Sequence, residues 1–330
     1  MKQLTEKDRE RLEEIRNTRT IGVLMGGPSA EREISIKSGE AVFGHLKEAG
    51  YPVEKVLFQT EEELKTILAE KQIGLAFLAL HGMFGEDGTV QEILETLQIP
   101  YTGSGVEASR LAFDKWRLRQ LLIRHRLPVP SSRLLGPLDP IPLHELVFPL
   151  VVKPVCQGSS LGLSIADTKE ALPSAIQQAF RYDHRLLLEE YIEGREITVG
   201  ILEEEALPIV EIIPGNRFYD FDAKYKSDKT QFKVPALLEE DAAQNVQWLA
   251  RKAHLLSGCE GFSRVDFLLR HSGSPVLLEV NTIPGLTSRS LLPRACSSVG
   301  ISFLSLCERL LLQTLRRVVI RHAETQVPKS

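Results

Sequence analysis

The chain has 330 residues, which is enough for two or three domains with a sizeable core. The hydrophobic fraction of 43% and the charged fraction of 25% are ordinary for a soluble globular protein. With 40 basic and 44 acidic residues the formal net charge is −4, which gives no reason to expect nucleic acid or a membrane surface as a main partner.

Neither targeting signals nor cysteine motifs are found. The N-terminal segment 1–20 is charged throughout, which excludes a secretory signal, and no run approaches the ~18 apolar residues that span a bilayer. The four cysteines form neither a CxxC pair nor a zinc-like spacing, so we expect no disulfide framework and no zinc site. The sequence therefore predicts a protein of the reducing cytoplasm.

The first predicted element is a charged helix over residues 4–17. Its only apolar positions are Leu4, Leu12 and Ile15. A helix with so few apolar side chains has little surface to bury. We therefore expect it to pack loosely, as an N-terminal extension.

Two short apolar strands follow, at residues 21–25 and within 73–82, and each ends at a glycine. Continuously apolar strands that alternate with helices predict a parallel sheet covered on both faces. Ligands of such sheets lie beyond the carboxyl ends of the strands. Glu31 and His81 follow those two ends and are candidates for a site. No GxGxxG motif follows the first strand, so a dinucleotide site lacks its fingerprint.

The rest of the chain alternates between helices and strands, except for one segment. Residues 214–235 show no clear periodicity, and a stretch of that length in a compact domain is often a lid or binding loop. The other elements predicted are helices at 105–126, 239–256 and 301–322 and strands at 147–154, 163–166, 186–202 (two strands around Gly194), 206–213, 262–269 and 275–281.

The last two strands predict an antiparallel hairpin around the turn 270–274. Side chains two apart share one face of a strand, so Arg264 and Asp266 share a face, as do Glu279 and Asn281. A turn centred in this segment would put Asp266 opposite Glu279 and Arg264 opposite Asn281.

Two carboxylates directly across a strand pair repel each other, and a divalent cation would offset that repulsion. Carboxylate and amide oxygens are hard ligands that suit Mg²⁺, Mn²⁺ or Ca²⁺. Mg²⁺ typically takes one or two carboxylates together with substrate phosphates, so the hairpin predicts a nucleotide. The alternative is a solvated sheet face on which the four side chains pair with one another.

A phosphate site is predicted where Lys153 precedes the glycine- and serine-rich loop 156–162. Glycines let the backbone approach a phosphate, and consecutive N–H groups bind anions. The lysine precedes the glycines, so this is not a P-loop, and an ordinary turn beside a surface lysine is the alternative. Lys115 and Lys224 are further candidate cations.

Nine short segments together resemble the D-alanine–D-alanine ligases of the ATP-grasp superfamily, in the order of that family and across residues 21–293. They are GGPSAEREIS (26–35), LHGMFGEDGTVQ (80–91), PYTGSGVEAS (100–109), FDK (113–115), VKPVCQGSSLG (152–162), EEYIEGREITVG (189–200), YDFDAKY (219–225), RVDF (264–267) and LEVNTIPGLTSRSLLP (278–293).

The resemblance implies an α/β fold of three domains, with the α+β architecture of ATP-grasp proteins in the last two. The first, at 1–103, would be a Rossmann-like parallel-sheet domain with the first D-alanine site, and residues 1–19 would be its extension. The second, at 104–188, would carry the flap over the phosphates. The third, at 189–330, would carry the metal site and the lid loop 214–235.

The resemblance also implies an ATP site. Three lysines would hold the phosphates, a flap would cover them, the segment 189–192 would lie against adenine, and Glu196 would contact the ribose. The residues implied are Lys115, Lys153, Lys224, Ser160, Glu189, Glu190, Tyr191, Ile192 and Glu196. Two Mg²⁺ or Mn²⁺ ions would be bound by Asp266, Glu279 and Asn281.

For the substrates, Glu31 would anchor the ammonium of the first D-alanine, with His81 close by. Ser159 and Tyr225 would link to Glu31 in a hydrogen-bonded set that closes the lid. Arg264 and the Gly285 N–H would stabilise negative charge at the reacting carboxyl. The contacts implied for the second D-alanine's carboxylate are Ser290 and Leu291.

The implied reaction joins two D-alanines through an acyl phosphate, for peptidoglycan precursor synthesis, in an enzyme expected to be a homodimer. The base that deprotonates the second amine is either Tyr225 with Ser159 or the acyl phosphate itself. Tyr225 favours D-alanine as the second substrate. The alternatives are a D-alanine–D-lactate or D-alanine–D-serine ligase, another ATP-grasp carboxylate–amine ligase, and a non-catalytic nucleotide-binding protein.

Overall fold

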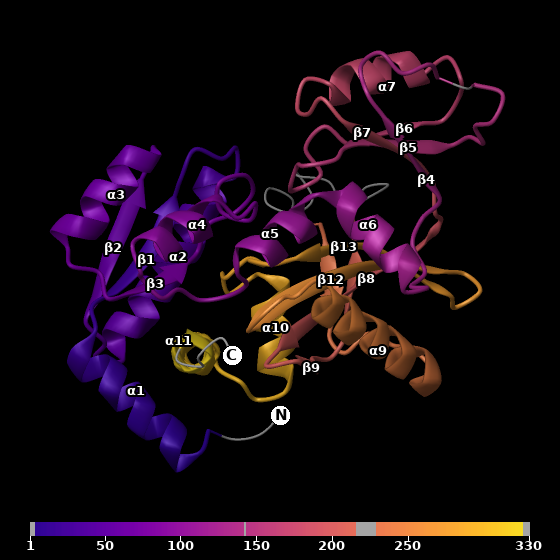
Figure 1. The fold of residues 1–330 in the computed structure, drawn as a ribbon. Coiled ribbons are helices and arrows are strands. Elements are labelled where there is room, and N and C mark those ends of the chain that lie inside the picture. The colour runs from indigo at the N-terminus through magenta and orange to yellow at the C-terminus, as the bar shows by residue number, and fades with distance from the viewer. Residues whose placement is uncertain (1–3, 142, 216–228, 326–330) are drawn as a thin grey trace, which may run out of the picture.

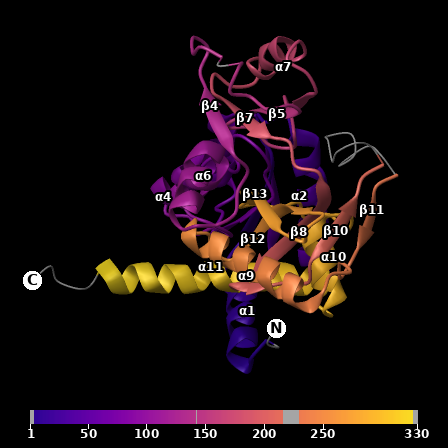
Figure 2. The ribbon, with the colours of Figure 1, turned by 90° about the vertical axis from the view of Figure 1, so that its right-hand side faces the viewer.

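A computed structural model describes residues 4–141, 143–215 and 229–325, with side chains up to residue 315. The described residues form three separate sheets, of three, four and six strands. Figures 1 and 2 show the four-stranded sheet projecting from the rest of the chain, and the long C-terminal helix packed beside the N-terminal one. The expected combination of one parallel sheet with antiparallel sheets is confirmed.

The N-terminal sheet is parallel and has the strand order β2-β1-β3. Every residue of β1 is buried, as a strand covered on both faces requires. Its carboxyl end leads through a glycine turn into α2, so polar residues after the strand lie at the edge where ligands bind. The elements are α1 (Glu6–Thr18), β1 (Ile21–Gly26), α2 (Arg32–Glu48), β2 (Val53–Phe58), α3 (Glu61–Glu70), β3 (Leu75–Leu78) and α4 (Thr89–Thr96).

Helix α1 does not pack loosely, so that prediction is wrong. Ile15 is fully buried and Leu12 is 6% exposed, within the core shared by the N-terminal sheet and the C-terminal helix α11 (Phe303–Thr325). A capping box between Thr5 and Asp8 fixes the start of α1. Its apolar partner comes from the opposite end of the chain, which the composition of α1 alone could not reveal.

The helix predicted over residues 105–126 is two helices, α5 (Val106–Phe113) and α6 (Lys115–Arg124). Asp114 between them is extended, and its side chain accepts a hydrogen bond from the Arg117 N–H at 2.9 Å. This cap stabilises the first turn of α6 and makes Lys115 its first residue. Both helices pack against the six-stranded sheet.

The four-stranded sheet is antiparallel, with the order β4-β7-β5-β6, and has a core of its own with α7. The glycine- and serine-rich loop connects β5 to β6 as predicted. The elements are β4 (Ser132–Leu135), β5 (Leu150–Pro154), β6 (Ser164–Ala166), α7 (Leu172–Ala179) and β7 (Leu186–Glu190).

The six-stranded sheet is antiparallel and contains the predicted hairpin. One face packs on α5, α6 and α9, and the other packs on α10 and α11. The elements are β8 (Gly194–Leu202), β9 (Glu205–Ala206), β10 (Val210–Ile213), β11 (Gln231–Lys233), α9 (Glu240–Leu256), β12 (Phe262–Arg270), β13 (Pro275–Asn281), α10 (Leu291–Ser298) and α11.

The predicted register of the hairpin is confirmed. Asp266 pairs with Glu279 and Arg264 with Asn281, and the register shifts just after Asp266. Val265, Phe267 and Leu269 point into the core under α9, so the four polar side chains share the opposite face. Several elements were not predicted, among them β2, α3, β4, α7 and α10, and β11 forms within 214–235. Residues 216–228 of that expected lid lie outside the described residues.

Within the described part of the chain, no single helix is long and apolar enough to cross a membrane. Helices α10 and α11 meet the criterion of length and composition only together, as a pair bent by 105°. Their apolar side chains lie in the core below the six-stranded sheet.

His254 on α9 should make the stability of the fold depend on pH. It is fully buried, its Nδ1 lies 2.7 Å from Ser263 Oγ, and burial, with a smaller contribution from the Arg251 charge, lowers its pKa to about 4. A base whose pKa falls on folding stabilises the protein fully above about pH 6.5, and this contribution is lost as the pH falls towards 4.

We therefore expect the His254→Gln variant to lose less unfolding free energy than the parent protein between pH 7 and pH 5, by about 2 kcal/mol. Urea unfolding at both pH values measures this difference. His144→Gln is the control, because its side chain is 82% exposed. Equal pH dependence in the parent and His254→Gln proteins would contradict the prediction.

Candidate active site

A cavity of about 1210 Å³ opens where the N-terminal sheet, the β5–β6 loop and the hairpin face of the six-stranded sheet meet. Ten of the residues predicted for the site line it, from six separate segments of the chain: Glu31, His81, Lys115, Ser159, Arg264, Glu279, Asn281, Gly285, Ser290 and Leu291. The cavity thus joins the regions predicted to bind the two D-alanines and the phosphates.

The remaining predicted residues are not among those that line this cavity. Lys224 and Tyr225 lie outside the described residues, so nothing is said of their positions. The others lie along β5, β7, β8, β12 and the adjoining loops: Lys153, Ser160, Glu189, Glu190, Tyr191, Ile192, Glu196 and Asp266.

Glu31 lies at the start of α2, and the β5–β6 loop reaches it across the cavity. It is 4% exposed, and the Ser159 hydroxyl donates a hydrogen bond to its Oε1. Two glycines, Gly82 and Gly158, pass so close to its Oε2 that a Cβ on Gly158 would lie 2.5 Å from that oxygen. The absence of a side chain at these two positions therefore permits the loop to close over the carboxylate.

Gly158→Ala should lower kcat/KM about tenfold, because the added methyl would push the loop from Glu31 and small misplacements of reacting groups are costly. Gly44→Ala is the matched control: it lies within α2 with nothing within 4 Å of its new Cβ. That change should leave activity unchanged and stabilise the protein by about 0.5–1 kcal/mol. Steady-state kinetics and thermal unfolding measure both effects. Unchanged kinetics in Gly158→Ala would contradict the prediction.

His81 connects the N-terminal region to the loop after the hairpin. Its Nδ1 lies 3.1 Å from the Ile283 carbonyl oxygen and its Nε2 lies 2.9 Å from Ser38 Oγ. A carbonyl can only accept, so Nδ1 carries the proton and Nε2 accepts from Ser38. Burial, together with the charge of Arg264, lowers the pKa of His81 to about 4 despite the Ile283 bond. The ring is therefore neutral and held at both nitrogens.

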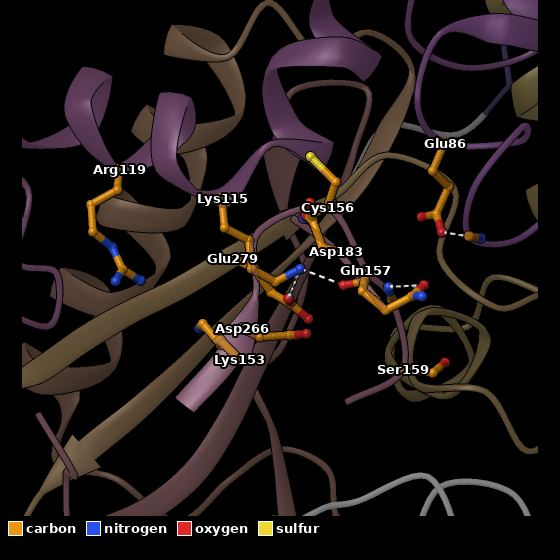
Figure 3. A network of polar contacts seen from close by, with 12 residues as sticks. Glu86, Lys115, Arg119, Lys153, Cys156, Gln157, Ser159, Asp183, Asp266 and Glu279 are labelled. Carbon is orange, nitrogen blue, oxygen red and sulfur yellow. Dashed lines mark hydrogen bonds and ion pairs between the residues drawn. The ribbon is translucent and has the colours of Figure 1, made fainter. Parts of the chain in front are cut away.

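The negative charge of the carboxylates on the hairpin face is balanced by nearby cationic side chains. The Arg264 guanidinium donates to both carboxylate oxygens of Asp266, at 2.8 and 2.7 Å, and the Thr198 hydroxyl donates to the same carboxylate at 2.5 Å. Opposite Asp266, Glu279 lies 3.7 Å from the Lys115 ammonium, which also donates to the Gln157 carbonyl at 2.5 Å (Figure 3). Arg264 and Asp266 therefore pair with each other, as they would on a solvated sheet face, whereas Glu279 faces the cavity.

A magnesium ion fits this donor set. In the described ranges no group of three or more His, Cys, Asp or Glu side chains could by itself hold a metal. Asp266, Glu279 and Asn281 offer two carboxylates and one amide oxygen on a single sheet face. Mg²⁺ characteristically completes such a set with waters and substrate phosphates.

Lys153 and Glu189 belong to a buried ionic cluster whose third member, Arg119, was not predicted. The two oxygens of Glu189 pair separately with Lys153, at 2.8 Å, and with Arg119, which is 2% exposed. Burial alone would raise the pKa of Glu189, but the two cations hold it below its ordinary value; burial lowers the pKa of Lys153. Two cations share one carboxylate, which leaves a positive charge suited to an anion.

The rest of the segment predicted to lie against adenine is more open. Glu190 accepts from the Arg270 guanidinium at 2.9 Å and from the Ser131 N–H at 3.2 Å. Ile192 is 5% exposed, while Tyr191 and Glu196 are half-buried.

Glu86 is the other residue of this region that the sequence did not single out. It is 7% exposed, lines the cavity, and accepts a hydrogen bond from the Gly82 N–H at 2.7 Å. Burial, and after it the charge of Glu31, raises the pKa of Glu86 to about 8. It lies in the matched segment LHGMFGEDGTVQ, but its position beside the hairpin depends on contacts between distant segments.

Comparison with known proteins identifies the family. Sequence models described as D-ala D-ala ligase N-terminus and C-terminus match residues 54–104 and 142–312. D-alanine–D-alanine ligase from Geotalea uraniireducens is 46% identical over 296 residues, which are 89% of this chain and 95% of that protein.

Solved structures agree with this assignment. D-alanine–D-alanine ligase from Bacillus anthracis complexed with ATP has a TM-score of 0.79 and 32% identity, covering 93% of this chain and 100% of that one. The VanG D-Ala:D-Ser ligase from Enterococcus faecalis has a TM-score of 0.77 and 29% identity, covering 90% and 99%. The chain therefore belongs to the D-alanine–D-alanine ligase family.

Proposed function

We propose that the protein uses ATP to join two D-alanines into D-alanyl-D-alanine, a peptidoglycan precursor. The observation that carries this proposal is the single cavity lined by Glu31, Ser159, Arg264, Glu279 and Asn281. An ammonium anchor, an oxyanion stabiliser and metal ligands thereby face one space, which a non-catalytic nucleotide-binding protein does not require.

In the first step the carboxylate of the first D-alanine attacks the γ-phosphate of ATP, giving an acyl phosphate and ADP. Glu31 anchors the substrate ammonium. Both reacting groups are anionic, so catalysis depends on cations that reduce their repulsion. Lys115 and Lys153 have this role, together with Lys224 from the segment outside the described residues.

The metal ligands in this proposal are Asp266, Glu279 and Asn281, for two Mg²⁺ or Mn²⁺ ions. When bound, the ions would neutralise charge on the transferring phosphoryl group. Lys115 lies 3.7 Å from Glu279 and therefore reaches the same region as these ligands.

In the second step the amine of the second D-alanine attacks the acyl carbon and displaces phosphate. Arg264 and the Gly285 N–H stabilise the tetrahedral oxyanion. Ser290 is the N-cap residue of α10, although its side chain makes no capping hydrogen bond, and the first N–H groups of a helix favour an anion such as the substrate carboxylate. With Leu291, Ser290 forms the acceptor site of this proposal. The base remains either Tyr225 with Ser159 or the acyl phosphate.

The specificity for D-alanine is part of the proposal, because a D-Ala:D-Ser ligase shares the fold. It rests on Tyr225, whose place lies outside the described residues. The division into three domains at about 103 and 188 and the homodimer also stay predictions, the latter from family resemblance alone.

Phosphate release from ATP with Mg²⁺ tests the function. We expect release that depends on D-alanine, accompanied by ADP and a product with the mass of the dipeptide. D-lactate, D-serine and L-alanine, each supplied beside D-alanine, test the second site. A folded sample that shows no D-alanine-dependent phosphate release would contradict the proposal. A preference for D-lactate or D-serine as second substrate would favour the corresponding alternative ligase.

A further inference from the structure

Glu86 connects two parts of the site that are distant in the sequence. Like Gly82, it lies in the loop between β3 and α4, whereas Asn281, Arg264 and Asp266 lie on the hairpin. One carboxylate oxygen accepts from the Gly82 N–H at 2.7 Å, and the other faces the amide of Asn281. Figure 3 shows the Glu86 carboxylate with one of its hydrogen bonds drawn as a dashed line.

Donors and acceptors determine the orientation of the Asn281 amide. Arg264 can only donate, so the amide atom that faces its guanidinium, at 2.8 Å, is the oxygen. The amide nitrogen then donates to Glu86 Oε1. The network therefore runs from the Gly82 backbone through Glu86, Asn281 and Arg264 to Asp266, and every hydrogen bond in it has a donor and an acceptor.

Packing alone cannot select this orientation, because the oxygen and nitrogen of an amide are nearly equal in size. The acceptor Glu86 on one side of the Asn281 amide and the donor Arg264 on the other select this orientation. If the amide turned over, its NH₂ group would face the donors of Arg264, and its oxygen would face the carboxylate of Glu86. Both contacts would then be repulsive.

We propose that Glu86 is a positioning residue, which fixes the Asn281 amide so that its oxygen faces Arg264 and the metal-binding face of the hairpin. This inference rests on the proposed function, because it concerns the same site. Glu86 acts through Asn281 and Arg264 and needs no contact with substrate. Residues that orient metal ligands in this way typically contribute about 10–100-fold to metal affinity or activity.

The isosteric Glu86→Gln variant separates orientation from size. The new amide must keep its oxygen on the Gly82 N–H, so its NH₂ group faces the NH₂ of Asn281. Two donors then oppose each other, or Asn281 turns over and opposes Arg264. We expect kcat/KM for D-alanine to fall about 10–100-fold and the Mn²⁺ dissociation constant, measured with ADP present, to rise by a similar factor.

The reciprocal double variant Glu86→Gln/Asn281→Asp is the decisive test. The amide of residue 86 would donate to one oxygen of the new carboxylate, whose other oxygen accepts from Arg264, and the total charge is unchanged. We expect activity and Mn²⁺ affinity to recover to within about threefold to tenfold of the parent protein, on the scale of such effects. Asn281→Asp alone should be impaired, because two carboxylates would then face each other.

Glu92→Gln on α4 is the control, since that side chain is 60% exposed, and it should match the parent protein. Thermal unfolding confirms that each variant folds. Full activity and Mn²⁺ affinity in Glu86→Gln would overturn the inference, as would a double variant no better than Glu86→Gln alone. A parent protein inactive on D-alanine would refute the proposed function instead, and the Mn²⁺ measurements would still decide the role of Glu86.

Discussion

Replacement of Arg264 by Met should lower kcat for dipeptide formation by about 10²–10³-fold, the cost of removing one donor to a developing oxyanion. The structure gives a second reason. Arg264 donates to both oxygens of Asp266 and also to Asn281, so its loss leaves the carboxylate of Asp266 opposite Glu279 without that partner. Both effects act on the chemical step more than on nucleotide binding.

The kinetic pattern distinguishes this role from a structural one. We expect the KM for ATP to change much less than kcat, because an interaction made mainly in the transition state lowers kcat and kcat/KM together. Arg264→Lys keeps the charge but loses the bidentate contact, so it should restore only part of the rate. Arg133→Met is the control, as its pair with Glu145 is about half exposed. If Arg264→Met kept more than about a tenth of the parent rate, the oxyanion role would be wrong.

The hairpin could be predicted from sequence because strand geometry is local. Side chains alternate with a period of two, and a short turn fixes which residues face each other. These two facts were enough to pair Asp266 with Glu279 and Arg264 with Asn281, as observed. The apolar N-terminal strands were predictable for the same reason, since their pattern reflects burial on both faces.

The features that were missed depend on contacts between distant segments. Helix α1 is buried by α11, which is contributed by the other end of the chain. Arg119 lies on an ordinary amphipathic helix and gains its significance only because β7 brings Glu189 to it. Glu86 likewise becomes part of the site only when its loop meets β13. The periodicity of apolar residues contains no information on contacts between distant segments, so the sequence alone could not identify these residues.

The balance of charge on the hairpin shows a related limit. The alternation of side chains along the strands predicted a cation near Asp266 and Glu279, but it did not indicate which cation that would be. Arg264 and Lys115 supply part of that charge from within the chain. The need for a metal therefore comes from the phosphates of the proposed substrate as well as from the two carboxylates, and it requires a direct test.

Glu279→Gln provides that test, because a metal ligand and a residue of a solvated sheet face respond in opposite ways. For a ligand, kcat should fall by roughly 10²-fold or more, since metal charge stabilisation is worth several kcal/mol and about 1.4 kcal/mol is tenfold. The Mg²⁺ concentration needed for half-maximal rate should rise. Stability should stay level or increase by a few tenths of a kcal/mol, roughly, because the like-charged pair with Asp266 is removed.

Activity and stability should therefore diverge in this variant. On a solvated face the same change would leave the rate and its Mg²⁺ dependence unaltered. Glu205→Gln on β9 is the matched control, since it is an exposed glutamate of the same sheet. Phosphate release across a Mg²⁺ titration, with thermal unfolding of the same samples, measures both quantities. A Glu279→Gln protein with the parent's rate and Mg²⁺ dependence would show that the carboxylate pair repels without serving a metal, and Lys115 would then be its main counter-charge.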